Sequence, residues 1–244
     1  MEPDELGTLL GVWAHPDDEA YMTAGLMSVA RSAGHRVAVA TATKGEAGTD
    51  DPQTWPPDRL ALARERETAQ SLAAVDVVEH QWLGHRDGTL HQVPSAYGVE
   101  QVSQLIEEFE PDTIVTFGPD GMTGHRDHRA VSDWTTAAWI RAGRPGRLWY
   151  ATVTLEFHQT WGAVNDEVGL WFEGSNPPSD SSYELAFALH CEGELLERKF
   201  AALAAHRTQT SGLIELVGPE RYRQWWSRES FVNATRRLGE EHAA

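Results

Sequence analysis

Cysteine and cationic side chains are the residues that this sequence has least of. Cys191 is the single cysteine among 244 residues, and 20 lysines and arginines stand against 37 aspartates and glutamates, a formal charge of −17. One cysteine cannot form an internal disulfide, which suits a reducing compartment and excludes a cysteine-rich zinc site. So few cations do not make a face that follows nucleic-acid phosphates or binds an anionic membrane. We therefore expect neither nucleic acid nor membrane as a partner.

The sequence also lacks a targeting segment and a membrane-spanning segment. The first residues, Met1–Leu6, contain no basic stretch, and the apolar run that follows is short. This pattern is not typical of a signal peptide. No run approaches the roughly 18 apolar residues that a membrane helix needs. The sequence therefore predicts a cytoplasmic enzyme or binding protein.

Hydrophobic residues make up 41% of the chain and charged residues 23%, which indicates a folded globular protein. The length suits one domain, and we expect residues 1–244 to form it. Apolar or β-branched runs predict strands over residues 8–14, 36–43, 76–83, 112–117 and 147–157. Amphipathic stretches predict helices over residues 17–32, 59–74, 98–110 and 128–142. This alternation predicts an α/β fold, Rossmann-like, with a mainly parallel sheet and helices on both faces.

The last third of the sequence is less regular. Residues His158–Ser182 contain Gly, Pro, Ser and Asn and are expected to form a long loop, a candidate substrate lid. A further strand is expected at Tyr183–His190 and a further helix at Glu194–His206. The final residues, 238–244, are expected to be a frayed tail.

Two polar motifs follow two of the predicted strands. Ala14–Glu19 reads A-H-P-D-D-E after the first strand, and Gly124–His128 reads G-H-R-D-H after the fourth. Each motif alone also suits an ordinary helix start or polar turn. Ligands bind beyond the carboxyl ends of parallel strands, where both motifs would converge. Together they predict a catalytic zinc site with histidine and carboxylate ligands and one position open for water.

Other common catalytic patterns are missing. There is no G-x-G-x-x-G after the first strand, no P-loop, no G-x-S-x-G elbow and no H-E-x-x-H helix. Residues Gly84–Asp87 repeat the G-H-R-D of the second motif, but Gly88 stands where that motif has its second histidine. This copy is therefore the weaker ligand candidate.

The two motifs resemble those of the PIG-L/LmbE-like family of zinc-dependent deacetylases, which remove acetyl groups from N-acetylglucosamine-type amino sugars. The resemblance covers nearly the whole chain. It continues through the segments Thr43–Glu46, Arg64–Glu67, Leu83–Gly88 and Lys199–Gln209. One departure is Thr123, where members of sugar-thiol pathways carry a tyrosine, and this puts that particular substrate in doubt.

The resemblance implies a role for individual residues. It implies zinc, or another divalent metal such as Fe²⁺, held by His15, Asp18 and His128. It implies a catalytic group made of Asp17 as general base, His125 as oxyanion stabiliser or proton donor, and Asp127, which orients a histidine. It implies contacts to sugar hydroxyls from Glu46, Arg64 and Asp87, with Arg66 as a competitor of Arg64. His206 and Gln209 match the family without an assigned role.

The substrate implied is a small amino sugar or glycoconjugate, and a homo-oligomer is compatible with the sequence. Two other functions remain open: a metal-dependent phosphoesterase with the same Asp/His set, which would need more cations, and a sugar-binding protein without catalysis.

The sequence has 10 tryptophans, and their positions predict different roles. Trp134 and Trp139 lie on a predicted helix and are expected in the core. Three others fall in expected loops near the ligand edge, where they suit either loop packing or a sugar platform: Trp55, Trp161 and Trp171. The pair Trp225 and Trp226 is expected to pack the C-terminal segment.

Overall fold

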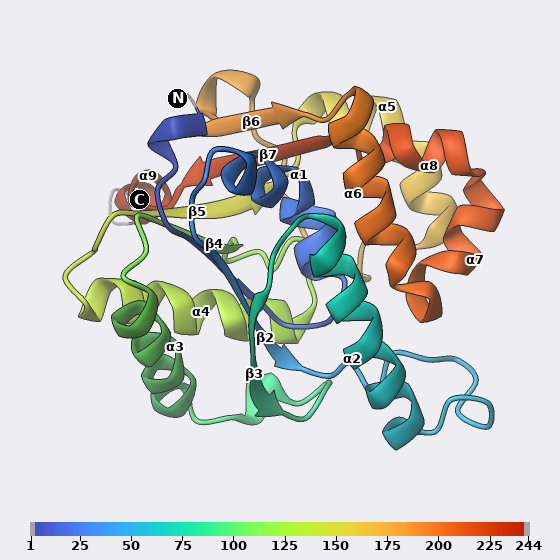
Figure 1. The fold of residues 1–244 in the computed structure, drawn as a ribbon, viewed down its shortest axis with the longest axis horizontal. Coiled ribbons are helices and arrows are strands. Elements are labelled where there is room, and N and C mark those ends of the chain that lie inside the picture. Colours follow the sequence, from blue (N-terminus) through green and yellow to red (C-terminus); the bar gives the residue numbers. More distant parts are fainter. Residues whose placement is uncertain (1–2, 242–244) are drawn as a thin grey trace.

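A computed structural model describes residues 3–241. These residues form one seven-stranded sheet with helices on both sides (Figure 1). The strands are β1 (Leu9–Trp13), β2 (Val37–Thr43), β3 (Glu79–His85), β4 (Thr113–Phe117), β5 (Arg147–Thr152), β6 (Phe187–His190) and β7 (Arg228–Asn233). The helices are α1 (Asp18–Ser32), α2 (Pro57–Ala74), α3 (Ser95–Phe109), α4 (Arg126–Arg141), α5 (Leu155–Val168), α6 (Gly193–Ala205), α7 (Arg207–Val217), α8 (Pro219–Trp225) and α9 (Ala234–Glu241). Short 3₁₀ turns lie at Pro3–Glu5, Leu90–Gln92 and Ser182–Glu184.

The strand order confirms the predicted fold class. The sheet runs β3-β2-β1-β4-β5-β7-β6, with parallel pairing from β3 to β5 and antiparallel pairing on both sides of β7. Helices α1, α2 and α6 pack on one face, and α3 packs against α4 on the other. The chain changes direction along the sheet between β1 and β4. Such a switch point is where open α/β sheets bind ligands.

The core explains why the central strands read as short apolar runs. Every residue of β1 and β4 is buried, so these strands have no polar face. Trp134 and Trp139 are both only 2% exposed, which confirms their predicted place in the core. Gly98 lets α3 approach α4, since a Cβ there would lie 2.1 Å from the indole of Trp134.

The predicted long loop at His158–Ser182 is wrong in its first half. Strand β5 ends at Thr152, and α5 begins at Leu155, inside the stretch that was expected to be strand and loop. Thr154 caps this helix by accepting the backbone N–H of Phe157, and Gly169 ends it at a φ of 64°. The irregular part of the predicted lid is therefore confined to residues 169–181.

The C-terminal segment contains elements that the sequence did not predict. Helices α7 and α8 and strand β7 follow α6, and β7 lies between β5 and β6. Helix α9 covers most of the predicted tail, whose last residues, 242–244, lie outside the described part of the chain. Within residues 3–241, no helix is long and apolar enough to cross a membrane.

A buried ion pair stands at the middle of α1. Lys199 donates from Nζ to Glu229 and to the carbonyl of Tyr21, while the Glu229 carboxylate accepts the backbone N–H groups of Gly25 at 2.7 Å and Leu26 at 2.8 Å. Side chains of α6 and β7 thus bind backbone groups inside α1. This contact ties the helix that follows the first motif to the end of the chain.

Cys191 lies beside this pair and is expected to resist alkylation. Burial, and then the neighbouring Glu229 carboxylate, raise the pKa of its thiol to about 12, and the residue is 0% exposed. The reactive species is the thiolate, so the native thiol stays protonated and inert at pH 8. Mass spectrometry after iodoacetamide treatment should find Cys191 unmodified in buffer and modified in urea. Native labelling at the rate of a free thiol would contradict this.

Candidate metal centre and active site

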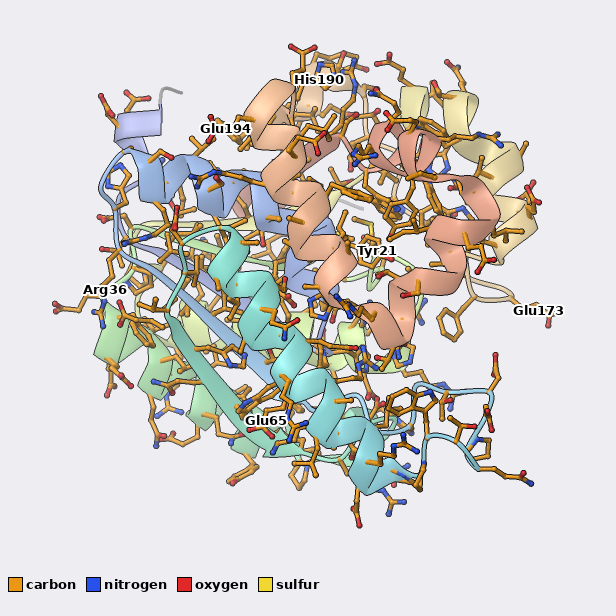
Figure 2. The ribbon with its side chains drawn as sticks, turned by 45° about the vertical axis from the view of Figure 1, so that its right-hand side comes forward. Tyr21, Arg36, Glu65, Glu173, His190 and Glu194 are labelled. Carbon is orange, nitrogen blue, oxygen red and sulfur yellow. The ribbon has the colours of Figure 1, made fainter. Side chains whose placement is uncertain are left out.

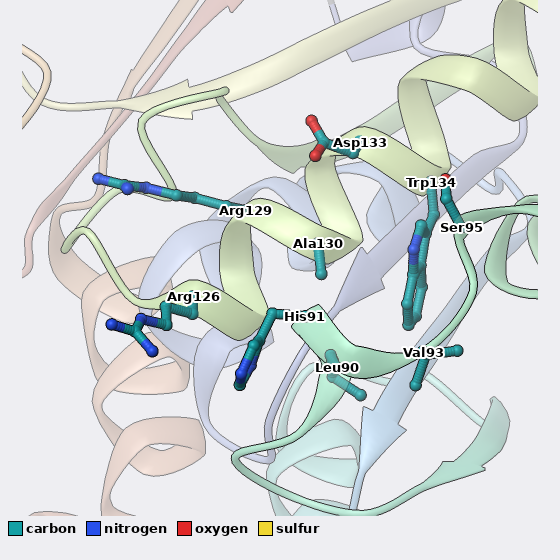
Figure 3. Close-up of a pocket in the computed structure, with 9 residues that line it drawn as sticks. All are labelled: Leu90, His91, Val93, Ser95, Arg126, Arg129, Ala130, Asp133 and Trp134. Atoms are coloured by element: carbon teal, nitrogen blue, oxygen red, sulfur yellow. The ribbon is translucent and has the colours of Figure 1, made fainter.

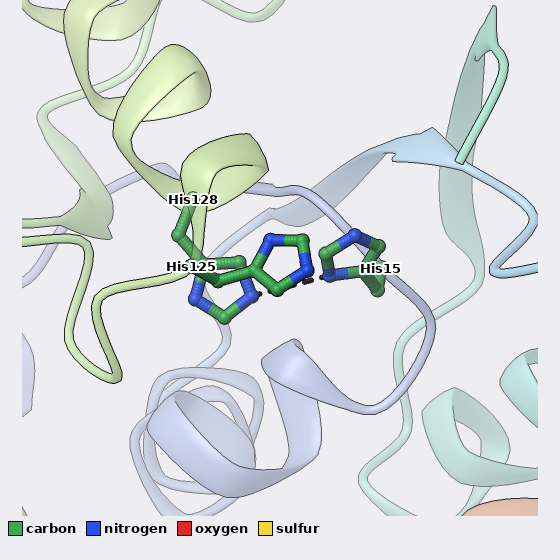
Figure 4. Close-up of side chains that lie close together, drawn as sticks. All are labelled: His15, His125 and His128. Carbon is green, nitrogen blue, oxygen red and sulfur yellow. Dashed lines mark hydrogen bonds between the residues drawn. The ribbon is translucent and has the colours of Figure 1, made fainter. Parts of the chain in front are cut away.

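The two predicted motifs meet at the carboxyl ends of β1 and β4. His15 Nδ1 lies 3.1 Å from His128 Nε2, and the Asp18 carboxylate lies 3.6 Å from the first and 3.3 Å from the second. Figure 4 shows the His15 and His128 rings converging from their separate segments, with His125 beside them. The three predicted ligands, His15, Asp18 and His128, are all buried, with 9% or less exposure.

The spacing of these ligand atoms fits a metal ion with tetrahedral coordination. Zinc bonds to nitrogen and oxygen are about 2.0–2.2 Å long, so neighbouring ligand atoms lie roughly 3.3–3.5 Å apart. His15, Asp18 and His128 approach that geometry without rearrangement. The nitrogens of His15, His125 and His128 also lie within 4.8 Å of one another, and Asp18 adds a carboxylate in contact with both His15 and His128.

Asp17 is held beside this cluster in a strained conformation. Its φ is 99°, which only a few non-glycine residues tolerate. Its N–H donates to Glu19 Oε2 at 3.0 Å, and its carboxylate lies 3.4 Å from the Arg64 guanidinium. Burial raises the pKa of Asp17 to about 7, with Arg64 acting in the opposite direction. A base with a pKa near neutrality is suited to proton transfer.

Arg64 is buried at 3% exposure and braces the loop of Asp17. Its guanidinium donates to the carbonyls of Pro16 and Gly45. It also lines the cavity described below, whereas Arg66 is exposed on α2. Of the two arginines that the sequence left in competition, the structure therefore brings Arg64 to the site.

Glu19 and His206 form a second buried contact behind Asp17. His206 Nε2 lies 2.7 Å from Glu19 Oε1, which also accepts the hydroxyl of Ser71, and both residues are 0% exposed. Their mutual attraction raises the pKa of His206 and lowers that of Glu19, against the effect of burial. The sequence singled out His206 without a role, and the structure makes it the partner of the last residue of the first motif.

The Nε2 edge of the His15 ring contacts two carboxylates. His15 Nε2 lies 3.1 Å from Asp87 and 3.5 Å from Asp127. Burial alone would lower the pKa of His15, but hydrogen bonds with Asp127 and Asp87 raise it to about 10. Asp127 is 0% exposed and also accepts the N–H groups of Gly88 and Leu90. These carboxylates fix the ring so that Nδ1 faces the other two candidate ligands.

His125 stands at the N-terminus of α4 and caps it. Its Nδ1 accepts the backbone N–H of Asp127 at 3.1 Å, so the proton of the neutral ring lies on Nε2. Burial and the neighbouring His15 and His128 lower the pKa of His125 to about 4. The resemblance implied His125 as oxyanion stabiliser or proton donor, and these surroundings favour a neutral imidazole that can donate a hydrogen bond from Nε2.

A cavity of about 910 Å³ opens from this cluster. It is lined by the metal-ligand candidates and by Asp17, Arg64, Asp87 and His125, but Glu46 is not among the described lining residues. Glu46 instead accepts the backbone N–H of Asp87 at 3.0 Å. Among the tryptophans, the cavity is lined by Trp171, Trp225 and Trp226.

A smaller hollow of about 260 Å³ lies between α4 and the turn at residues 90–92 (Figure 3). His91 lines it, and its Nδ1 is 3.8 Å from Asp127, on a different oxygen from the one that faces His15. None of the three predicted metal ligands lines this hollow, so the larger cavity is the candidate substrate site.

Comparison with known proteins identifies the family of this chain. The family model described as "PIG-L: GlcNAc-PI de-N-acetylase" matches residues 10–139. A relative in Saccharomonospora viridis, named 1D-myo-inositol 2-acetamido-2-deoxy-alpha-D-glucopyranoside deacetylase, is 32% identical, over 87% of this chain and 87% of its own. A relative in Bacillus subtilis, named probable N-acetyl-alpha-D-glucosaminyl L-malate deacetylase 2, is 29% identical, over 84% of this chain and 85% of its own.

Among solved structures, N,N'-diacetylchitobiose deacetylase from Pyrococcus horikoshii superposes with a TM-score of 0.63 at 20% identity. The match covers 93% of this chain and 83% of that one, and it supports the shared fold. On the family match and the first relative, the chain belongs to the PIG-L family of de-N-acetylases.

Proposed function

We propose that this protein is a zinc-dependent hydrolase that removes an acetyl group from the amide nitrogen of an N-acetylglucosamine-type sugar or glycoconjugate. The observation that carries the proposal is the contact of His15, Asp18 and His128, at 3.1–3.6 Å, beside the strained and buried Asp17. The family and the names of both curated relatives point to the same reaction class.

The three ligands would hold the metal and leave a position open toward the cavity. Zinc there supplies a Lewis acid that activates water and polarises the amide carbonyl. Two imidazole nitrogens and one carboxylate suit zinc, and Fe²⁺ is compatible with the same donors.

Asp17 is the proposed general base. It takes a proton from the attacking water, whose oxygen bonds to the amide carbon. His125 donates a hydrogen bond from Nε2 to the oxygen on which negative charge develops. The C–N bond then breaks, the leaving nitrogen receives the proton that Asp17 took up, and acetate and a free amine result.

The remaining predicted residues support these groups. Asp127 is proposed to position His15, since it is fully buried and faces that ring. Asp87 and Arg64 lie at the cavity wall and are proposed to contact sugar hydroxyls, in addition to bracing the site. Glu46 is proposed to act on the sugar through the Asp87 loop that it holds.

The charge of the cavity argues against a phosphoesterase. Arg64 is the one arginine or lysine among the described residues that line it, and its guanidinium already bonds two backbone carbonyls. Phosphoryl transfer depends on cations that stabilise the transferred group. A binding protein without catalysis would have no need of Asp17, whose strained backbone carries a cost of about 1–3 kcal/mol.

The decisive experiment measures metal and activity together. Purified protein is expected to bind about one zinc per chain and to release amine from N-acetylglucosamine conjugates, but no phosphate from model esters. His15→Ala should lose both zinc and activity, because one of three ligands is gone. His190→Ala, an exposed histidine at the end of β6, is the matched control and should keep both (Figure 2). A zinc-loaded wild-type protein without amidase activity would refute the proposal.

A further inference from the structure

The cavity extends well beyond the space that an amino sugar fills. Pockets for drug-sized ligands span roughly 300–1,000 Å³, and this cavity, at about 910 Å³, is near the upper end. A single amino sugar is smaller than such a ligand. The substrate therefore has room for a second part beside the sugar.

The cavity wall has a polar part and an apolar part. Near His15 the wall carries carboxylates and imidazoles. The apolar part is formed by side chains of α1, of the segment after α5, of α7 and of the residue that follows α8. We call six of these the apolar wall: Tyr21, Met22, Leu170, Trp171, Leu213 and Trp226. The rings of Tyr21 and Trp226 meet at 4.6 Å, edge to face, which makes this wall continuous across two elements.

The acidic lining of the cavity disfavours an anionic group on the part of the substrate that contacts the apolar wall. Asp50 lines the cavity in addition to the carboxylates of the site, and Arg64, the one arginine or lysine among the described lining residues, lies 3.4 Å from the Asp17 carboxylate. A carboxylate or phosphate on the part of the substrate beyond the proposed zinc would therefore lie among carboxylates without a cation to pair with, which is costly once water is displaced.

The apolar wall continues from the catalytic cluster toward the surface, the direction in which an aglycone would extend. The amide must lie at the metal ligands, which are buried. The segment that carries Trp171 runs from the catalytic cluster to the surface: the Phe172 ring lies 5.0 Å from the His125 ring, yet Phe172 is 53% exposed, and the next residue, Glu173, projects from the outer loop (Figure 2). With the amide at the buried end, the part of the substrate that reaches this outer end is the group linked to the sugar.

Building on the proposed function, we propose that the substrate of this enzyme carries a neutral aglycone with an apolar face, and that the apolar wall binds it. Apolar surface removed from water stabilises the complex in proportion to its area. The apolar wall thus favours aglycones that offer apolar surface, and the acidic lining disfavours anionic aglycones.

The test compares kcat/KM for amine release by the zinc-loaded protein from three sugars. Benzyl N-acetylglucosaminide is expected to exceed free N-acetylglucosamine and N-acetylglucosaminyl malate by about tenfold or more. Trp171→Ala should reduce the advantage of the benzyl glycoside severalfold. Trp55→Ala, a tryptophan outside the described cavity lining that stacks on Arg59, is the matched control and should leave it unchanged.

Each result separates the two proposals. If no sugar releases amine, the proposed function fails. If amine is released, but the malate conjugate or the free sugar reacts as well as the benzyl glycoside, the proposed function stands and the aglycone inference is wrong. A gain from lengthening the N-acyl chain, without a gain from the benzyl group, would also overturn the inference.

Discussion

Replacing Asp17 by asparagine is expected to lower kcat for amide hydrolysis about 100- to 10,000-fold while zinc stays bound. Asparagine has the same shape and tolerates the left-handed φ of 99° at this position, but it cannot take up a proton. The proposed metal ligands His15, Asp18 and His128 are unchanged, so the metal content should be unchanged.

The measurement is zinc per chain by atomic absorption together with single-substrate kinetics. Asp166→Asn, an exposed aspartate on α5, is the matched control and should have wild-type kcat. If Asp17→Asn loses zinc to the same extent as His15→Ala, then Asp17 is a ligand and the separation between base and ligand is wrong. Unchanged turnover would show that another group accepts the proton.

The second large effect concerns stability: Lys199→Met is expected to lower the free energy of unfolding by about 3–5 kcal/mol. The side chains of Lys199 and Glu229 are only 1% and 0% exposed, so removing the ammonium leaves a buried carboxylate without its charge partner. The same change removes the donor to the carbonyl of Tyr21.

Urea denaturation followed by tryptophan fluorescence measures this loss. Lys44→Met is the control, because Lys44 and Glu65 form a pair at 2.9 Å that is about two-fifths exposed, and such pairs contribute about 0–1 kcal/mol. Adding Glu229→Gln to Lys199→Met should recover part of the loss, since the unpaired charge is gone. Equal effects of Lys199→Met and Lys44→Met would contradict the role of the buried pair.

Local patterns predicted the half of the molecule that precedes β5. Strands β1 and β4 are buried on both faces and read as apolar runs, and the motifs after them lie where parallel strands must converge. The contacts of His15, Asp18 and His128 therefore follow from strand order, which the alternation of elements predicted. Helix α5 could have been found as well, since Thr154 and Gly169 are ordinary start and stop signals within a segment rich in other turn residues.

Contacts between distant residues could not be predicted in the same way. The partner of Glu19 is His206, 187 residues later, and the partner of Lys199 is Glu229 on an antiparallel strand. A charged side chain that becomes buried needs a partner of opposite charge. Which residue becomes that partner depends on how remote elements pack, and the sequence does not show it. The supporting network around Asp17 is therefore visible only in three dimensions.

The position of β7 has a consequence for synthesis on the ribosome. Strand β5 pairs with β4 and β7, and β6 pairs only with β7 among the described strands, yet β7 is made after both. Until residues 228–233 emerge, the nascent sheet has an open edge at β5. The backbone N–H groups of Gly25 and Leu26 then still lack their contact with the Glu229 carboxylate. Helix α1, among the first elements translated, is thus completed by one of the last, which favours a late folding step in which β7 is inserted between β5 and β6.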